Sequence, residues 1–147
     1  KKAMSVVEAA DYFVYYKKDG MDLPFEQTAH TLTDFLSSEQ IPVEKKSKKG
    51  TRTLDLSPFI YSFNVNRIKD LSDIWIKENI LSDEFCTADD DLYYEMQVSS
   101  GSSDNIKPEL VISAFHSYLG LNNEPSLAVH RKELYTKEGD AFVPLIK

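Results

Sequence analysis

Cysteine is almost absent from this chain of 147 residues, in which Cys86 is the only one. A single thiol excludes an internal disulfide framework and a cysteine-clustered metal site within one chain, and it fits a reducing cytoplasm. No apolar run is long enough to cross a bilayer and no charged-then-apolar leader opens the chain, so we expect neither membrane insertion nor secretion. A phosphate-cradling glycine loop, a nucleophile elbow and a zinc pattern are missing too. An enzyme acting alone is therefore the least favoured function.

The composition is that of a globular domain, because 41% of the residues are hydrophobic and 28% are charged. These proportions exclude a wholly disordered or collagen-like chain. A chain of this length buries roughly 70% of the surface that its unfolded form exposes, so it needs no metal or disulfide to fold. We expect one domain over residues 1–147. Because the chain starts abruptly at Lys1, we interpret it as the C-terminal part of a longer protein.

Charge is distributed unevenly along the chain. The formal net charge is −7, yet one stretch of eight residues carries five positive charges and no acid, so the rest of the chain carries −12. An acidic body repels nucleic acid and anionic membranes over most of its surface. An anionic partner is therefore expected to meet the basic stretch. Its charged residues are Lys45, Lys46, Lys48, Lys49 and Arg52.

Hydrophobic periodicity predicts the secondary structure. Alternating side chains predict strands over residues 10–17, 41–43, 51–56, 60–65, 92–98 and 126–135. Helical spacing predicts one helix from Asp22 to about Ser38 and a second from Pro108 to Gly120. Gly50 supplies a tight turn, which places the basic stretch at a hairpin tip. Residues 66–91 break the alternation, and we interpret them as an insertion that contains a short helix.

This order of elements predicts an α+β fold of the ferredoxin-like, split β-α-β type. Two helices would cover one face of an antiparallel sheet, with the basic hairpin and the inserted segment as additions. Many unrelated functions share this fold, so the fold alone indicates none of them.

Two sets of polar residues on the expected helices are weak candidates for a site. Glu26, His30 and Asp34 are spaced by four and share a helix face, which would allow weak metal binding but is more typical of a solvated face. We therefore predict no metal site. His116 is expected on the polar side of the second helix, near Glu109, where no partner for acid–base catalysis is visible.

Asp55 is the weak catalytic candidate. Arg52 to Asp55 is loosely similar to the stretch in which pseudouridine synthases place their catalytic aspartate, although Thr53 stands where their arginine would be. The alternative is structural, with Asp55 accepting backbone amides in the turn through Ser57-Pro58. His130 and Arg131, in the last expected strand, are candidate ligand contacts or ordinary edge residues.

The basic hairpin is the strongest candidate for function. Its cations would suit phosphate contacts with RNA, although residues 44–53 include no aromatic side chain for base stacking. The alternative is a hairpin edge that lysines protect against aggregation.

Several short blocks then carry a family resemblance. They are AADY (9–12), IPVEKKSKKGTRTLDLSPFI (41–60), IKPELVISAF (106–115) and VHRKELY (129–135). In this order they resemble the C-terminal half of the radical SAM-linked proteins, a bacterial family of unknown function encoded beside or fused to cobalamin-binding radical SAM proteins. The resemblance implies that such a protein is the partner and carries the iron–sulfur cluster. Cys86 alone cannot supply the three thiolates that a cluster requires, so we expect no cofactor in this chain.

Three functions follow as expectations. The first is a non-catalytic accessory domain that docks a radical SAM partner or its substrate through the basic hairpin. The second is an RNA-binding module in tRNA or rRNA modification. The third is an enzyme centred on Asp55.

Overall fold

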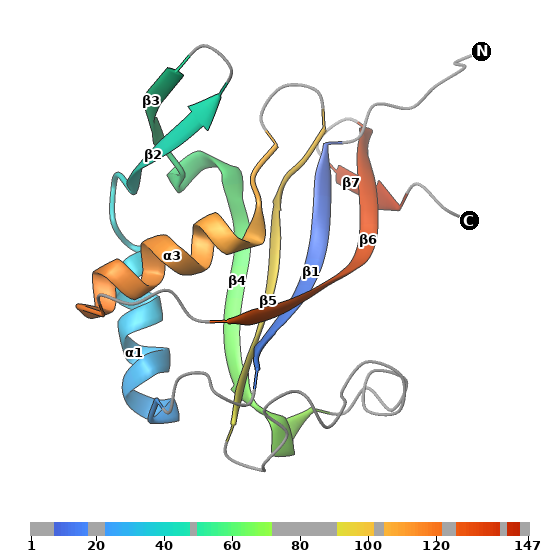
Figure 1. Ribbon diagram of the computed structural model, residues 1–147. Helices are drawn as coiled ribbons and strands as arrows, with labels where there is room; N and C mark the ends of the chain where they lie inside the picture. The colour runs from blue at the N-terminus through green and yellow to red at the C-terminus, as the bar shows by residue number, and fades with distance from the viewer. Residues whose placement is uncertain are drawn as a thin grey trace.

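A computed structural model of the protein describes residues 8–17, 23–47, 50–71, 91–101, 105–121, 126–138 and 141–144. Within these ranges a five-stranded antiparallel sheet carries two helices, and a two-stranded sheet stands apart from it (Figure 1). The strands of the large sheet are β1 (Ala9–Tyr16), β4 (Ile60–Arg67), β5 (Leu92–Ser99), β6 (Leu127–Glu138) and β7 (Ala141–Pro144). The helices are α1 (Phe25–Leu36) and α3 (Pro108–Leu119), and the small sheet consists of β2 (Pro42–Ser47) and β3 (Gly50–Asp55). The predicted α+β architecture is confirmed.

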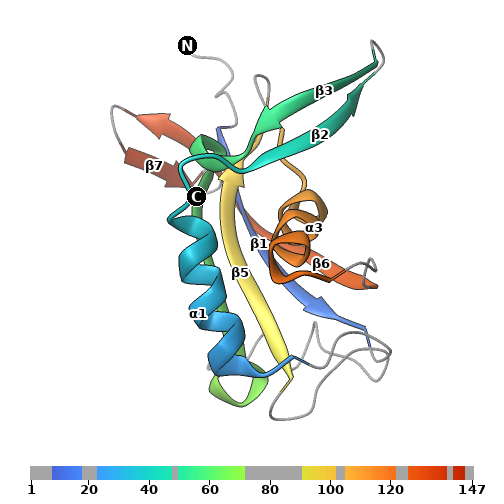
Figure 2. The same ribbon diagram turned by 90° about the vertical axis from the view of Figure 1, so that its left-hand side faces the viewer.

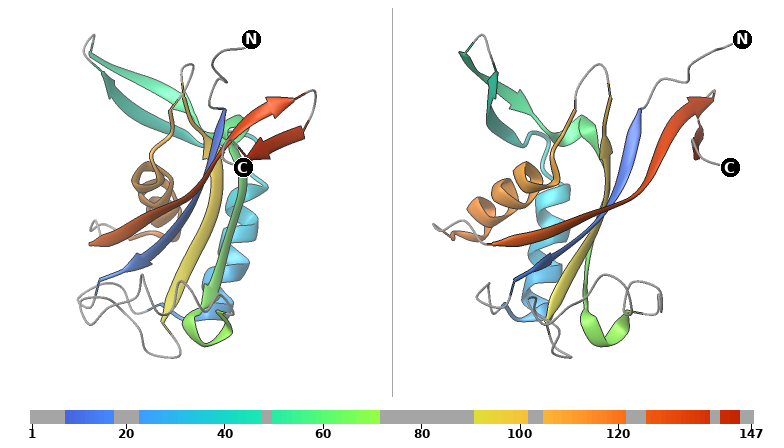
Figure 3. Two further views of the ribbon diagram at one scale, coloured as in Figure 1. Left: turned by 90° about the vertical axis from the view of Figure 1, so that its right-hand side faces the viewer. Right: turned by 45° about the vertical axis from the view of Figure 1, so that its right-hand side comes forward.

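The strand order in the large sheet is β4-β5-β1-β6-β7, and every neighbouring pair is antiparallel. In the chain, α1 lies between β1 and β4, and α3 lies between β5 and β6. Both helices cover the same face of the sheet, in front of it in Figure 2 and behind it in the left view of Figure 3. The two faces of the sheet therefore have different surroundings.

Two features of the strands go beyond the sequence prediction. The hairpin was predicted, but it forms a sheet of its own instead of extending the large one. The last strand was predicted over residues 126–135, whereas β6 continues to Glu138 and pairs there with β7, from Tyr135 opposite Pro144 to Glu138 opposite Ala141.

α3 begins and ends at the predicted residues, whereas α1 begins at Phe25 and ends at Leu36, and the predicted first residue Asp22 lies outside the described residues. α1 begins directly after Pro24, and the Thr28 hydroxyl donates to the Pro24 carbonyl over 2.7 Å. α3 begins at Pro108, where the missing N–H costs nothing. It ends at Gly120, whose φ of 86° is the left-handed conformation that glycine adopts readily.

The main core lies between the sheet and the helices. In β1 the alternation turns Val14 and Tyr16 towards the helices, and Phe13 and Tyr15 towards the opposite face, as predicted. Phe115 of α3 is fully buried at the centre of the helix side. A second cluster buries part of the opposite face. Its members are Phe13, Tyr15, Ile68, Leu71 and Tyr93.

The predicted insertion joins two neighbouring strands. Arg67 at the end of β4 pairs with Leu92 at the start of β5, and Ile68–Asp70 form a 3-10 turn. The rest of the predicted insertion, including the expected short helix with Trp75, lies outside the described residues. No helix in the described ranges has the length and apolar character that crossing a bilayer requires.

Candidate functional site

The hairpin of β2 and β3 projects from the body of the protein beyond α3 (Figure 2). Its register pairs Lys45 with Arg52 and continues to Ser47 opposite Gly50. Residues 50–53 of β3 are exposed along its outer half. Lys48 and Lys49 lie outside the described residues, as do the side chains of Lys45 and Lys46. The projection of the backbone is thus described, whereas the arrangement of the four ammonium groups stays a prediction.

Asp55 fixes the base of the hairpin. Its Oδ1 accepts the N–H of Ile41 over 2.7 Å and the N–H of Ser57 over 3.0 Å. Leu56 donates its own N–H to the Ile41 carbonyl over 2.9 Å. These bonds tie the residue before β2 to the residues after β3. The geometry therefore supports the structural role of Asp55 that the turn through Ser57-Pro58 predicted, rather than the catalytic role.

A cleft of about 450 Å³ opens between β2 and α3. The side chains on the outward side of α3 are small and do not fill this space. Tyr118, which is 48% exposed, also lines the cleft. Helical spacing does not predict this cleft, because it gives no information about which element lies opposite α3. The lining residues are Phe35, Ser38, Gln40, Ile41, Pro42, Val43, Glu44, Leu110, Ser113, Ala114, Ser117 and Tyr118.

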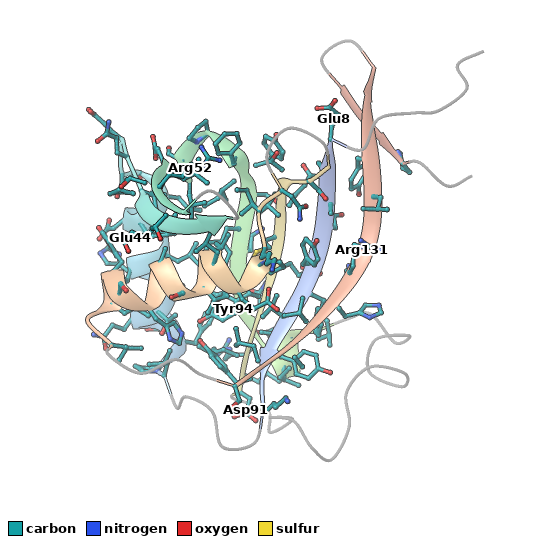
Figure 4. All side chains as sticks on the ribbon, turned by 45° about the horizontal axis from the view of Figure 1, so that its top comes forward. Glu8, Glu44, Arg52, Asp91, Tyr94 and Arg131 are labelled. Atoms are coloured by element: carbon teal, nitrogen blue, oxygen red, sulfur yellow. The ribbon has the colours of Figure 1, made fainter. Side chains whose placement is uncertain are left out.

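His116 is buried, which corrects the prediction that it lies on the polar side of its helix. Only 2% of the residue is exposed, because it follows Ile112 by four positions on the face of α3 that packs on the sheet. Its Nε2 lies 2.8 Å from the Tyr16 hydroxyl, which in turn lies 2.6 Å from the Tyr94 hydroxyl. Tyr94 lies between the sheet and α3 (Figure 4). The three side chains form a polar row inside an apolar core.

Burial keeps this row neutral. It lowers the pKa of His116, because the apolar surroundings disfavour the charged imidazolium. It also raises the pKa of Tyr94 to about 12, although the hydrogen bond between the Tyr94 and Tyr16 hydroxyls partly offsets this effect. His116 Nδ1 has no hydrogen-bond partner in the described part of the chain.

We expect acid to destabilise the protein through His116. Its folded pKa lies below the ordinary value of about 6.5, so the unfolded chain binds the proton first and stability is lost as the pH falls below that value. The free energy of unfolding should fall by at most about 1.4 kcal/mol per pH unit through this protonation. Urea titrations at several pH values should show that His116→Phe reduces the slope. Equal slopes for His116→Phe and the natural protein would contradict this.

A smaller cleft of about 190 Å³ lies on the sheet face opposite the helices, beside Asp11 and Lys132. Asp11 accepts hydrogen bonds from Gln97 Nε2 over 3.1 Å and from the Tyr135 hydroxyl over 2.7 Å. Lys132 forms an ion pair with Glu95 over 3.2 Å. The charged groups thus hold β5, β1 and β6 together at this position.

The structure does not bring the other candidates together. Arg131 is exposed on β6, and in Figure 4 the strands β4, β5 and β1 lie between it and Arg52. His130 is half-buried opposite Phe13. Neither cleft is lined by Asp55, His130 or Arg131.

The predicted polar residues of α1 lie at the surface of the helix. His30 and Asp34 are highly exposed, and their side chains lie 3.8 Å apart. In the described ranges, no group of three or more histidine, cysteine or acidic residues has an arrangement that would hold a metal ion.

Comparison with known proteins gives one match. A family described as "Uncharacterized protein conserved in bacteria (DUF2344)" matches residues 1–108. No curated protein and no solved structure matches the chain.

Proposed function

Because the chain belongs to DUF2344, a family of uncharacterised proteins conserved in bacteria, we propose a function that rests on its own surface: it is a non-catalytic docking domain. The β2–β3 hairpin is the surface that meets the partner. The observation that carries this proposal is the projection of the hairpin from an otherwise acidic chain. A protruding cationic element attracts an anionic surface while the body repels it, which orients the encounter.

The construction of the hairpin supports this role. Leu54 and Leu56 are buried at its base, and the Asp55 carboxylate holds the strands where they leave the body. The outer half, from Gly50 to Thr53, packs on no core and remains exposed. Anchored bases and exposed ends are typical of elements that bind other molecules.

The partner is a radical SAM protein, or its substrate, in the cytoplasm. The similarity of residues 41–60 and 106–115 to the radical SAM-linked proteins supports this assignment. In this proposal the partner contributes the cluster and the radical chemistry, and the present chain contributes contact and orientation.

The RNA-binding and enzymatic alternatives have weaker support. Residues 44–53 contain no aromatic side chain on which a base would stack. The Asp55 Oδ1 already accepts two backbone N–H groups at the hairpin base, and no cleft includes Asp55 with His130 or Arg131.

We also propose that the large sheet is of the ferredoxin-like type. Without β7, its order is β4-β5-β1-β6, with α1 between β1 and β4 in the chain and α3 between β5 and β6. The small sheet of β2 and β3 is then an addition between α1 and β4.

Co-purification with a radical SAM protein encoded beside this chain tests the docking function. The full-length protein should associate with it at low salt. Replacing all five basic residues of the hairpin by glutamine should weaken the association at least about tenfold, since charge pairs across an interface set both the encounter rate and the register. The variant carries changes at Lys45, Lys46, Lys48, Lys49 and Arg52.

The matched control removes positive charge elsewhere. Lys69→Gln with Lys107→Gln changes two exposed positions outside the hairpin and should leave the association unchanged. The proposal fails if the natural protein does not associate at low salt, or if the five-residue variant associates equally well. Salt-sensitive binding of tRNA that this variant loses, without protein association, would establish the RNA alternative instead.

A further inference from the structure

One edge of β2 is free of β3 and borders the larger cleft. Among the described strands β2 pairs with β3 alone, and the cleft is lined by residues of β2 but by none of β3. The Leu56 N–H bonds to the Ile41 carbonyl, which sets the alternation of the antiparallel ladder. Val43 therefore turns its N–H and C=O towards β3. Glu44 turns its N–H and C=O towards the cleft, together with the C=O of Pro42.

Below this edge, α3 offers a floor of small side chains. Ser113, Ala114 and Ser117 lie along its outward side, with Leu110 and Tyr118 flanking them. A strand added to β2 would run about 4.8 Å from it, directly above this floor. Every second side chain of that strand would point into the 450 Å³ cleft, which has the size of a typical binding pocket.

The register of the hairpin adds positive charge to this edge. Lys45 and Arg52 are paired, two residues beyond the pair of Val43 and Leu54 along the hairpin. Val43 lines the cleft and Leu54 is buried, so the basic stretch of the sequence begins directly beyond the cleft. A segment that follows β2 outward therefore passes from a cleft with both apolar and polar lining residues to the basic stretch of the hairpin.

We propose that this cleft binds an extended acidic peptide segment, which pairs through its main chain with β2 and places alternate apolar side chains over α3. The inference rests on the proposed docking function and names the chemistry that the partner presents. Main-chain pairing supplies affinity and the cleft supplies specificity, as in other cases of strand addition. The absence of aromatic residues from 44–53 favours a peptide over RNA.

A proline at position 44 tests the pairing directly. Glu44→Pro removes the N–H that faces the cleft, while the hydrogen bonds of β2 to β3 use other residues. The probe is a fluorescent decapeptide of alternating glutamate and valine, titrated into the full chain and followed by anisotropy. The natural protein should bind it saturably, and Glu44→Pro should bind at least about tenfold more weakly. A decapeptide of alternating lysine and valine should not bind.

Two variants control for side effects. Glu44→Ala removes the same carboxylate but keeps the N–H, so it should bind the peptide at least as well as the natural protein. Thr53→Pro blocks the opposite edge of the hairpin, because Thr53 pairs with Glu44 and turns its N–H away from β2. Its binding should change less than twofold, and the circular dichroism spectrum of each variant should match that of the natural protein.

The outcomes separate this inference from the docking function. Equal binding by Glu44→Pro and Glu44→Ala, or no saturation of the natural protein at millimolar peptide, overturns strand addition. If strand addition is overturned but the five-residue glutamine variant no longer associates with the radical SAM protein, docking through the hairpin stands and only the proposed mode of binding is wrong. If that variant retains the partner while Glu44→Pro loses the peptide, the docking function fails and the peptide site stands.

Discussion

Phe115→Ala is expected to lower the free energy of unfolding by about 3–5 kcal/mol, the range for truncating a fully buried phenylalanine. Phe115 is 0% exposed, and its ring centroid lies 5.3 Å from that of Phe35 and 5.6 Å from that of Phe63. Tyr94 contributes a third ring at 6.1 Å. These side chains come from both helix and sheet, so the cavity cannot close by the movement of one element. Urea or guanidinium denaturation followed by circular dichroism measures the loss.

The control is Ser117→Ala, two residues further along α3. Ser117 is exposed, so its truncation should change the free energy of unfolding by no more than about 0.5 kcal/mol. A loss below about 1 kcal/mol for Phe115→Ala would contradict the description of the core. It would mean that α3 does not pack on the sheet through this ring.

Tyr16→Phe is expected to lower the free energy of unfolding by about 2–4 kcal/mol, although only one oxygen atom is removed. The Tyr16 hydroxyl lies between His116 Nε2 and the Tyr94 hydroxyl, and its loss leaves two buried polar groups without their partner. Each unsatisfied buried group costs about 1–3 kcal/mol. Chemical denaturation at a pH above 7, where His116 is neutral in both states, isolates this effect from protonation.

Tyr94→Phe is the matched comparison, since it removes the hydroxyl at the end of the row. If His116 Nε2 carries the proton and donates to Tyr16, and Tyr16 donates to Tyr94, the Tyr94 proton is the one without an acceptor. If the direction is reversed, the unpaired proton is on His116 Nδ1, which has no partner in the described ranges. We therefore expect Tyr94→Phe to cost less than Tyr16→Phe. A greater cost at the end of the row than at its centre would contradict the arrangement.

The sequence predicts most of the fold because local signals are strong here. Phe13 to Tyr16 alternate between two buried faces, so every strand residue carries the pattern. Pro108 and Gly120 mark the ends of α3, and Gly50 with φ of 117° marks the turn of the basic hairpin. In each case the residue type itself sets the backbone conformation.

The parts that the sequence does not predict depend on contacts between distant residues. His116 belongs to the core because Tyr16, one hundred positions earlier, offers it a hydrogen bond over 2.8 Å. The cleft exists because β2 crosses above the small residues of α3 without filling the space. Helical periodicity gives the side of α3 on which Ser113 lies, but it does not indicate what stands opposite. The docking function, the partner and the peptide site remain proposals.

The clamp of Asp55 on Ile41 and Ser57 has a consequence for the evolution of this domain. The chain leaves the body before β2 and returns to it after β3 at the same place. The hairpin is therefore a loop whose two ends are held together. Lengthening such a loop costs little conformational entropy, about 0.6 kcal/mol for each doubling of its length. Homologues are thus free to carry a hairpin of different length or charge at this position, while the large sheet and its two helices stay the same. Partner choice can diversify without any need to redesign the scaffold.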